Sequence, residues 1–450
     1  MNWRKPVIYS LLSTTPYPIP RYLRYMRKWE RASTADLEAL VENKRSNLLY
    51  RAWSDIPYYR RILQQCGAVI DGNVDLSRFA EIPVLTRQIV KEQGAELESC
   101  QKRGRGAFVN HSGGSSGEPV TFLQDRLYNA WNIANTMYFK TFGGQKAGEL
   151  ELRLWGSQRD LLEGSESAVV RLRNWLYNRV EINAFTMTRE NMARYAEKIN
   201  FYRPSWIEAY AQPMAELARF IKQQKISVHS PRGVLTSAGT LYSEMRSLIE
   251  EVFGCRVFNR YGGREAGGIA CSCGEQTGLH VSVWNTYVEI LDEKLKPVPA
   301  GQVGKLYITT LNNFTMPLIR YDVGDMAIWQ DKACSCGRTT PVLANVVGRS
   351  TEVFRTRDGR IIPAELFIHF IGVVFNAGYI EKFQVIQRAY EKILIRVVLN
   401  DRAQFETFKE RIVALVQNVM GSGCAVEFEF VDDIKPQANG KFLYTICEVN

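Results

Sequence analysis

The run from His111 to Val120, His-Ser-Gly-Gly-Ser-Ser-Gly-Glu-Pro-Val, is the part of this chain best suited to chemistry on a phosphate. Glycines let the backbone bend until its N–H groups face an anion, and serine hydroxyls add further donors. A Ser/Gly run can equally be a plain flexible loop, so this run alone leaves both interpretations open. The candidate phosphate-binding residues are Ser112, Gly113, Gly114, Ser115, Ser116 and Gly117.

Four later segments combine glycine with charged or aromatic residues, as nucleotide sites do. They are Tyr261-Gly-Gly-Arg-Glu265, Tyr321-Asp-Val-Gly-Asp325, Gly348-Arg349 and Pro436-Gln-Ala-Asn-Gly-Lys441. Each could by itself be a turn, a loop or a solvated surface. The order of all five along one chain is what favours a nucleotide site.

The tetrapeptide Cys-Ser-Cys-Gly occurs twice, with Cys271 and Cys273 in the first copy and Cys334 and Cys336 in the second. His280 lies close to the first copy, so five candidate ligands are available for a tetrahedral metal site. Zinc is the favoured interpretation. A disulfide and unrelated free thiols are the alternatives.

The composition is that of a large cytoplasmic globular protein. Of 450 residues, 46% are hydrophobic and 23% are charged, which allows a large domain and a smaller one. No apolar run approaches the length of a membrane span, and the N-terminus lacks the pattern of a signal peptide. Nine cysteines without a repeating framework favour reduced thiols or metal ligands over a disulfide scaffold.

The elements that must position these motifs alternate between helices and short apolar strands, which predicts an α/β body. A helical preface covers about residues 1–80. Helices are predicted at 123–142, 189–199 and 242–253, and strands at 206–210 and 256–259, the last leading into a loop over 261–265. Strand-rich segments at 281–291 and 304–310 indicate a β subdomain.

Beyond Gly348 the pattern changes to a compact α+β unit. Strands are predicted at 383–387, 392–399 and 425–431, and a helix at 405–419. We therefore divide the chain into an N-terminal domain at 1–348 and a C-terminal domain at 349–450.

In order and separation, the five motifs resemble those of the adenylate-forming superfamily, which contains acyl-CoA synthetases, luciferases and the adenylation domains of peptide synthetases. Within it, the chain most resembles the phenylacetate-CoA ligase branch and its CapK-like proteins of capsular polysaccharide synthesis. The resemblance extends from about Ala35 to the end of the chain. It implies a large adenylate-forming domain followed by a small, mobile C-terminal domain.

The resemblance implies a role for each motif. Ser112 to Gly117 would hold the β- and γ-phosphates of ATP, and His111 would contact phosphate or cap the loop. Glu265 would bind Mg²⁺, since carboxylate oxygens suit this hard cation. Tyr261 and Gly262 would contact adenine. The segment Ser237, Ala238 and Gly239 would line the adenine and acyl pocket. Asp325 and Arg349 would contact the ribose.

Lys441 is implied to reach the substrate carboxylate and the α-phosphate during adenylation, where its charge would offset developing negative charge. The C-terminal domain would then rotate about a hinge just after Gly348-Arg349. This chain has Thr351 where the hinge usually has Asp, and Val120 where many phosphate loops have Lys. These departures bear on the second step more than on adenylation.

Members of this branch also have a Cys…His and Cys-x-Cys pattern, which maps to Cys273, His280, Cys334 and Cys336. Cys271 is then spare, or replaces His280 as a ligand. Four protein ligands would make the zinc site structural. Weak candidates for the acyl pocket are Tyr210, Ala211 and Ala238.

The net charge of +10 is compatible with anionic ligands, but no nucleic-acid motif accompanies it. Much of the excess lies near the N-terminus, where cations and aromatic residues alternate. That segment would suit contact with the inner membrane surface; a solvated helical arm packed on the body is the alternative.

These observations predict an ATP-dependent ligase. It would convert a small-molecule carboxylic acid to an acyl-adenylate, release pyrophosphate, and pass the acyl group to CoA or an amine. The CapK-like resemblance implies a role in polysaccharide biosynthesis. The alternatives are a catalytically idle nucleotide-binding homologue and a scaffold at the membrane.

Overall fold

The computed structural model describes residues 2–112, 120–155, 168–184, 187–349, 354–358, 361–362, 367, 371, 379–435 and 442–449. Its first part is helical, with α1 at Arg4–Ser13, α2 at Ile19–Trp29, α3 at Thr34–Asp55 and α4 at Pro57–Gln65. Ser33 caps α3 by accepting a hydrogen bond from the Asp36 N–H group (3.1 Å). Short elements follow: β1 (Val69–Ile70), β2 (Asn73–Val74), η1 (Leu76–Glu81), α5 (Arg87–Gln93) and η2 (Gly94–Leu97).

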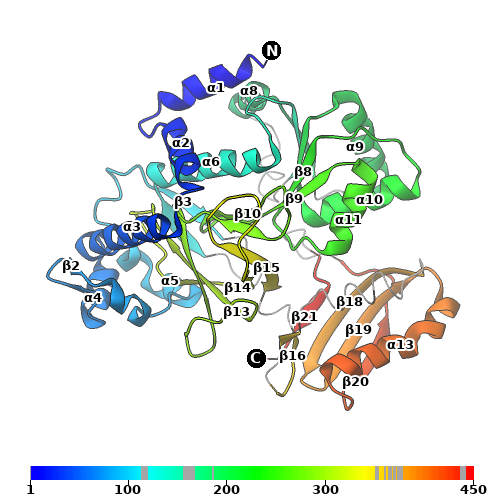
Figure 1. Ribbon diagram of the computed structural model, residues 1–450. Helices are drawn as coiled ribbons and strands as arrows, with labels where there is room; N and C mark the ends of the chain where they lie inside the picture. Colours follow the sequence, from blue (N-terminus) through cyan, green and yellow to red (C-terminus); the bar gives the residue numbers. More distant parts are fainter. Residues whose placement is uncertain are drawn as a thin grey trace.

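A long sheet forms the centre of the molecule (Figure 1). Its strand order is β12-β13-β14-β15-β11-β10-β9-β8-β7-β5-β6. The parallel strands are β5 (Glu151–Trp155), β6 (Arg179–Asn183), β7 (Trp206–Tyr210), β8 (Gly233–Ser237) and β9 (Arg256–Gly263). The antiparallel strands are β10 (Gly267–Ser272), β11 (Leu279–Val281), β12 (Thr286–Leu291), β13 (Val303–Thr310), β14 (Tyr321–Trp329) and β15 (Val342–Arg349).

Strand β9 joins the two halves of this sheet. It pairs in parallel with β8 and antiparallel with β10. The strands expected to form a β subdomain are therefore hydrogen-bonded to the parallel body through β9 and form one sheet with it.

The two faces of the parallel half differ in chemistry. One face is apolar, with Leu152, Ile207 and Val234 fully buried against helices. These helices are α9 (Arg189–Tyr202), α10 (Ala211–Gln223) and α11 (Ser243–Phe253), which cover that side of the sheet in Figure 1. On the other face, Glu151 and Glu208 are buried at alternating strand positions. Parallel sheets usually bury apolar residues on both faces, so the charged face requires compensation.

The helix expected over 123–142 begins later, because its first residues form a strand. Strand β3 (Phe108–His111) pairs with β4 (Thr121–Gln124), and α6 runs from Arg126 to Lys140 and continues into η3 (Thr141–Gly143). The carboxylate of Asp125 caps α6 by accepting from the Tyr128 N–H group (2.8 Å), so the helix cannot begin before Arg126. Helix α8 (Ala168–Tyr177) precedes β6.

The C-terminal unit is a four-stranded sheet with one helix, as expected for an α+β domain. Its strand order is β20-β19-β18-β21, with bounds Ala425–Phe430, Lys392–Leu399, Ile380–Ala389 and Thr445–Cys447. Helix α13 (Arg402–Met420) buries Phe405, Ile412 and Val416. Short strands β16 (Phe354–Arg355) and β17 (Ile361–Ile362) form a separate pair.

Most predicted elements are confirmed, with small shifts at their ends. The segment expected to be a loop over 261–265 differs, because β9 continues to Gly263 before the chain turns. No helix among the described residues is both long enough and apolar enough to cross a membrane.

Candidate functional site

The turn after β9 brings two strands unusually close. Gly262 and Gly268 are cross-strand partners, and a Cβ atom built on Gly262 would lie 2.1 Å from the Gly267 carbonyl oxygen. Only glycine allows this approach without a backbone shift. The packing of the hairpin therefore explains why the motif Tyr261-Gly-Gly-Arg-Glu265 has glycine at position 262.

Three of the predicted nucleotide motifs meet at the end of this hairpin. The Tyr261 hydroxyl donates to Asp325 Oδ2 at 2.5 Å, although the two residues lie on β9 and β14. Asp325 is the register partner of Arg349 on β15, so the backbone of Gly348-Arg349 passes beside it. A hydrogen bond to an ionised carboxylate is stronger than a neutral one and fixes both groups.

The end of β8 supplies a second wall. Ser237 is buried, and its hydroxyl donates to the Arg260 carbonyl oxygen (3.1 Å) on β9. Ala238 follows with a φ of 58°, in the left-handed region that strains a residue with a Cβ atom. This turn sends the chain from the carboxyl end of β8 through Gly239 toward α11, at the strand edge where α/β proteins bind ligands.

A pocket lies between these strand ends and the C-terminal unit. Its walls include Ala238, Gly239, Tyr261, Gly262 and Asp325, and its other side is formed by Phe442 to Thr445. Gln212, at the start of α10, holds the segment from Phe442 to Thr445 by two hydrogen bonds. Its side-chain amide donates to the Phe442 carbonyl oxygen (2.6 Å) and accepts from the Phe442 N–H group (3.0 Å). The residue directly after Lys441 is thus fixed at the pocket.

The ends of the Gly/Ser run are held by the β3–β4 hairpin. Ser112 is buried, its hydroxyl accepts from the Val120 N–H group (2.8 Å), and its own N–H group donates to the Val120 carbonyl oxygen (2.8 Å). His111 Nδ1 lies 3.1 Å from Thr121 Oγ1. Several predicted site residues lie outside the part of the chain that the structure describes. They are Gly113, Gly114, Ser115, Ser116, Gly117, Thr351, Lys441 and the side chain of Arg349.

Glu265 lies on the turn between β9 and β10. Its backbone carbonyl oxygen accepts from the Gln124 amide (3.3 Å) and from the Tyr128 hydroxyl (3.4 Å), while its side chain is half-buried. Gln124 also donates to the Arg264 carbonyl oxygen (2.9 Å). The turn is therefore anchored on the end of β4 and on α6.

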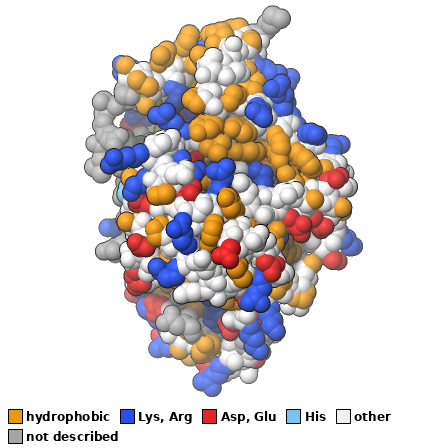
Figure 2. Space-filling view, turned by 90° about the vertical axis from the view of Figure 1, so that its left-hand side faces the viewer, with side chains coloured by type: hydrophobic (Ala, Val, Ile, Leu, Met, Phe, Trp, Pro, Cys, Tyr) orange, Lys and Arg blue, Asp and Glu red, His pale blue; other side chains and the backbone are white. Residues whose placement is uncertain are grey.

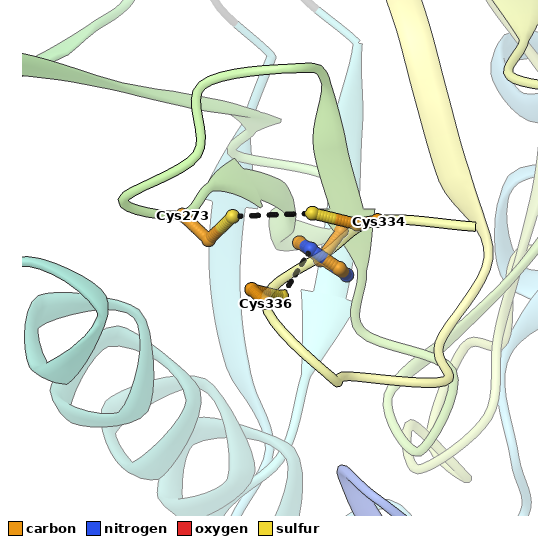
Figure 3. A group of neighbouring side chains, drawn as sticks. Cys273, Cys334 and Cys336 are labelled. Atoms are coloured by element: carbon orange, nitrogen blue, oxygen red, sulfur yellow. Dashed lines mark hydrogen bonds between the residues drawn. The ribbon is translucent and has the colours of Figure 1, made fainter. Parts of the chain in front are cut away.

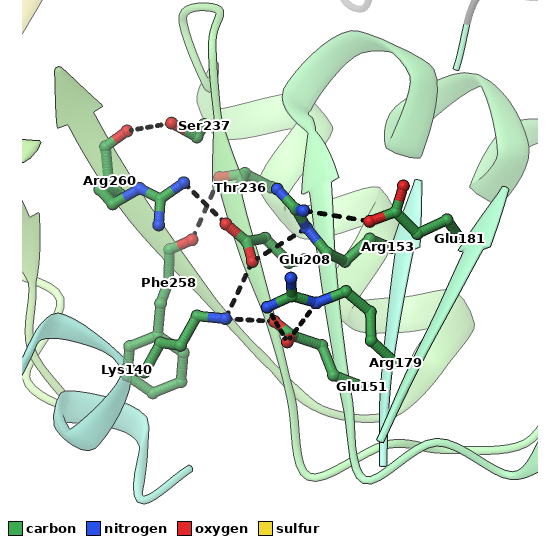
Figure 4. A network of polar contacts seen from close by, with 10 residues as sticks. All are labelled: Lys140, Glu151, Arg153, Arg179, Glu181, Glu208, Thr236, Ser237, Phe258 and Arg260. Atoms are coloured by element: carbon green, nitrogen blue, oxygen red, sulfur yellow. Dashed lines mark hydrogen bonds and ion pairs between the residues drawn. The ribbon is translucent and has the colours of Figure 1, made fainter. Parts of the chain in front are cut away.

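An ion network on the charged face of the sheet fixes β9 from the other side (Figure 4). At its centre Glu208, 3% exposed on β7, contacts Arg260 (2.7 Å), Lys140 (3.0 Å) and Arg153 (3.4 Å). Burial alone raises the pKa of Glu208, but Lys140, Arg260 and Arg153 together hold it well below its usual range. The carboxylate therefore stays ionised and draws Arg260, a pocket residue, toward β7.

The network extends away from the pocket through a second buried carboxylate. Glu151 on β5 contacts Lys140 and Arg179, the latter at 3.1 Å, and Arg153 reaches Glu181 (3.3 Å) on β6. The ion network thus links four strands of the sheet, β5, β6, β7 and β9, to helix α6.

The candidate metal ligands Cys273, His280, Cys334 and Cys336 come together, with their donor atoms all within 4.8 Å of one another. Figure 3 shows the three cysteines converging from two segments. Cys273 Sγ lies 3.5 Å from Cys334 Sγ, and Cys336 Sγ lies 3.3 Å from His280 Nε2. Zinc bonds of about 2.0–2.3 Å in a tetrahedron would place such donors about 3.5–3.8 Å apart, so the set fits zinc. Cys271 is not part of this group.

The surroundings of the group support this fit. His280 Nδ1 lies 3.1 Å from Thr340 Oγ1, a contact that orients the ring with Nε2 toward the cysteines. Burial, together with the nearby Arg338 guanidinium, lowers the pKa of His280 to about 4. With four protein donors around one point, a bound zinc would join the loop after β10 to the loop between β14 and β15.

Several residues of the site have no signal in the sequence. Gln212, Arg260, Asn259 and Asn345 line the pocket, and Glu208 acts on it through Arg260. Arg260 directly precedes a predicted motif, which is the one hint available. The others depend on contacts between segments far apart in the chain.

Comparison with known proteins agrees with this architecture. The AMP-binding enzyme family matches residues 175–316, and the CapK C-terminal domain family matches residues 354–448. Protein CapK of Staphylococcus aureus is 22% identical over 84% of this chain and 82% of its own length. Phenylacetate-coenzyme A ligase of Thermus thermophilus is 23% identical over 89% of this chain and 94% of its own length.

A solved 2-hydroxyisobutyryl-CoA ligase in its postadenylation state superimposes with a TM-score of 0.73, at 20% identity, over 97% of this chain and 93% of that one. The fold is that of the adenylate-forming enzymes. The chain belongs to this superfamily, in the branch that contains CapK and the phenylacetate-CoA ligases, and is an AMP-forming ligase.

Purified protein prepared without chelator should contain about one zinc per chain. Cys336→Ser should release most of that zinc and lower the melting temperature, because it removes one of four converging donors. Cys271→Ser is the matched control and should retain the metal, since Cys271 lies outside the group. Metal analysis with thermal unfolding measures both effects. Wild-type protein without zinc, or loss of zinc in the Cys271 variant alone, would contradict this ligand set.

Glu208→Gln should destabilise the fold by about 3–5 kcal/mol, because three buried cations lose their shared carboxylate. The depressed pKa of Glu208 also means that its contribution to stability is complete above about pH 4.3 and is lost as the pH falls through the folded-state value. Denaturant unfolding at pH 7 and at acid pH tests both statements. Glu190→Gln, in an exposed pair, is the control and should leave stability unchanged. Equal stability of the Glu208 variant and the wild type would remove the network as a constraint.

Proposed function

We propose that this protein activates a small-molecule carboxylic acid with ATP and Mg²⁺ and then transfers the acyl group to CoA. The observation that carries the proposal is the meeting of Tyr261, Asp325, Ala238 and Gly239 around one pocket whose far wall begins directly after Lys441. These segments lie far apart in the sequence, and a structural turn or surface loop has no need to place all of them together.

The nucleotide would bind at the carboxyl ends of the parallel strands. Asp325 would accept hydrogen bonds from the ribose hydroxyls, and its bond to Tyr261 fixes the carboxylate for that task. Tyr261 would lie against adenine, with Gly262 and the Ser237-Ala238-Gly239 turn beside it. Arg349, opposite Asp325 in the strand register, would add a cation at the ribose.

The phosphates and their metal would lie toward the β3–β4 hairpin. The run from Ser112 to Gly117 would surround the β- and γ-phosphates, and the closed base at Ser112 and Val120 supports this by fixing where the run begins and ends. Glu265 would bind Mg²⁺, since its turn is anchored on β4 of the same hairpin and its carboxylate remains half-exposed.

The reaction would take place in two steps. In the first, a carboxylate oxygen of the acid attacks the α-phosphorus of ATP, the bond to the bridging oxygen breaks, and pyrophosphate leaves with that electron pair. Lys441 would lie beside the carboxylate and the α-phosphate, where its charge offsets the negative charge of the transition state. Gln212 supports this by holding Phe442, the next residue, at the pocket.

In the second step, the acceptor attacks the acyl carbon and AMP leaves. CoA is the favoured acceptor, because phenylacetate-coenzyme A ligases are among the relatives of this chain. An amine is the alternative. Thr351 in place of the usual hinge Asp concerns this step, because the C-terminal domain would rotate near that residue. A role in polysaccharide synthesis follows only from the likeness to CapK.

Pyrophosphate release tests the proposal directly. We expect release that requires ATP, Mg²⁺ and one acid from a panel of aryl, fatty, amino and sugar carboxylic acids, with a thioester formed when CoA is added. Lys441→Ala should abolish release while ATP still binds, and Lys435→Ala, an exposed lysine of the same unit, should leave the rate unchanged. Bound ATP with no release for any acid would favour the idle homologue, and full activity of the Lys441 variant would remove Lys441 from the mechanism.

Asp325→Asn should raise the KM for ATP by about 10–100-fold with a smaller effect on kcat, because it weakens a charged hydrogen bond to the bound ribose. Initial rates at varied ATP concentration measure this. Asp331→Asn, at an exposed position just after the same strand and outside the pocket, should behave like the wild type. Equal KM values for both variants would argue against ribose binding at Asp325.

A further inference from the structure

Two helices far apart in the sequence expose large apolar side chains on one part of the surface. In α1 these residues are spaced by four, so they lie on one side of the helix. In α8 they are spaced by three. The exposed fractions are 48% for Trp3, 38% for Val7, 51% for Leu11, 75% for Val169, 64% for Leu172 and 57% for Trp175.

The two stripes are joined into one surface, which we call the α1–α8 surface. The rings of Trp3 and Trp175 lie 5.8 Å apart between centroids. The Arg4 guanidinium lies over both rings, at 4.7 Å and 5.7 Å, and donates to the Trp175 carbonyl oxygen. A contiguous apolar surface of this kind is unusual on a soluble protein and marks an interaction site.

The fold itself holds this surface in place. Ile8 is buried on the inner side of α1, and the Asn2 amide donates to the Ala147 carbonyl oxygen (2.8 Å). Helix α2 continues from α1 and buries Ile19, Leu23 and Met26 in the main core. The N-terminal segment is therefore packed on the body, as one of the two sequence-based interpretations expected, and still presents apolar side chains to solvent.

The described residues of α1, α2 and α8 carry charge of one sign. Residues 2–29 and 168–178 contain no Asp or Glu. The outer side of α2 carries exposed cations at helical spacing, namely Arg21, Arg24, Arg27 and Lys28, and α1 and α8 add Lys5, Arg171 and Arg173. Figure 2 shows apolar side chains gathered at the top of the molecule, where α1 lies in Figure 1, with Lys and Arg side chains at their margins.

We propose that the α1–α8 surface docks the enzyme on a bilayer that contains anionic lipids. The apolar stripes would enter the boundary between headgroups and acyl chains, and Trp3 and Trp175 suit that boundary because their rings are amphipathic. The cations would lie at the level of the anionic headgroups. The absence of acidic residues from these helices removes the repulsion that would oppose such contact.

Vesicle co-sedimentation of the full chain tests the proposal. We expect binding to vesicles of phosphatidylcholine with about 30% phosphatidylglycerol, and much weaker binding to phosphatidylcholine alone. Raising the salt concentration from about 0.1 M to about 0.5 M should weaken binding, because the headgroup attraction is screened.

Matched variants separate the α1–α8 surface from general stickiness. A triple variant that removes apolar side chains from the α1–α8 surface should bind vesicles about tenfold more weakly or worse. It combines Leu11→Gln, Val169→Gln and Leu172→Gln. Ile70→Gln, Phe201→Gln and Leu295→Gln together remove exposed apolar residues elsewhere and should leave binding unchanged. Arg21→Gln, Arg24→Gln and Arg27→Gln should reduce the preference for anionic vesicles. Unchanged melting temperatures check that each variant is folded.

Three outcomes would overturn the proposal. The first is a wild-type protein that does not bind anionic vesicles at low salt. The second is equal binding by the Leu11/Val169/Leu172 variant and the wild type. The third is concentration-dependent self-association that these substitutions abolish, without vesicle binding, which would assign the surface to a second copy of the chain. None of these outcomes depends on whether the enzyme turns over an acid.

Discussion

The buried carboxylate of Glu208 is stable only because three cations surround it, and one of them, Arg260, belongs to the strand that carries Tyr261. An ion removed from water at this depth would otherwise destabilise the fold by several kcal/mol. The network therefore fixes the lateral position of β9 against β7, β5 and α6. Because β9 also pairs with both halves of the sheet, its position determines where the pocket and the turn at Glu265 lie.

The candidate zinc ligands lie on the other side of β9 from the ion network, in the antiparallel half of the same sheet. Cys273 follows β10, His280 lies on β11, and Cys334 and Cys336 lie between β14 and β15. The strands β14, β15, β11 and β10 are neighbours in the sheet. The ends of β10 and β15 away from the ligands lead to the turn at Glu265 and to Gly348, and Asp325 lies in the middle of β14. A metal at this place would restrict the relative movement of the strands without touching the nucleotide. Its contribution is thus to the geometry of the pocket and to stability.

The sequence was sufficient for the family, the α/β body, the α+β C-terminal unit and the convergence of Tyr261, Asp325 and the four metal ligands. These features depend on local patterns and on the order of motifs. Sequence reasoning placed the start of α6 too early, because Leu123 fits a helical face as well as a strand until the cap at Asp125 is known. It missed Glu208 and Gln212, whose roles come from partners 52 and 230 residues away. Such pairings depend on topology and leave no periodic trace.

Contacts between the N-terminal body and the C-terminal unit meet at the pocket. Here the contact of Gln212 with Phe442 closes the pocket from the C-terminal side. Each of these two hydrogen bonds contributes about 0.5–1.5 kcal/mol. Both are made with backbone atoms of Phe442, so they fix the position of the chain at the pocket whatever side chain that residue carries.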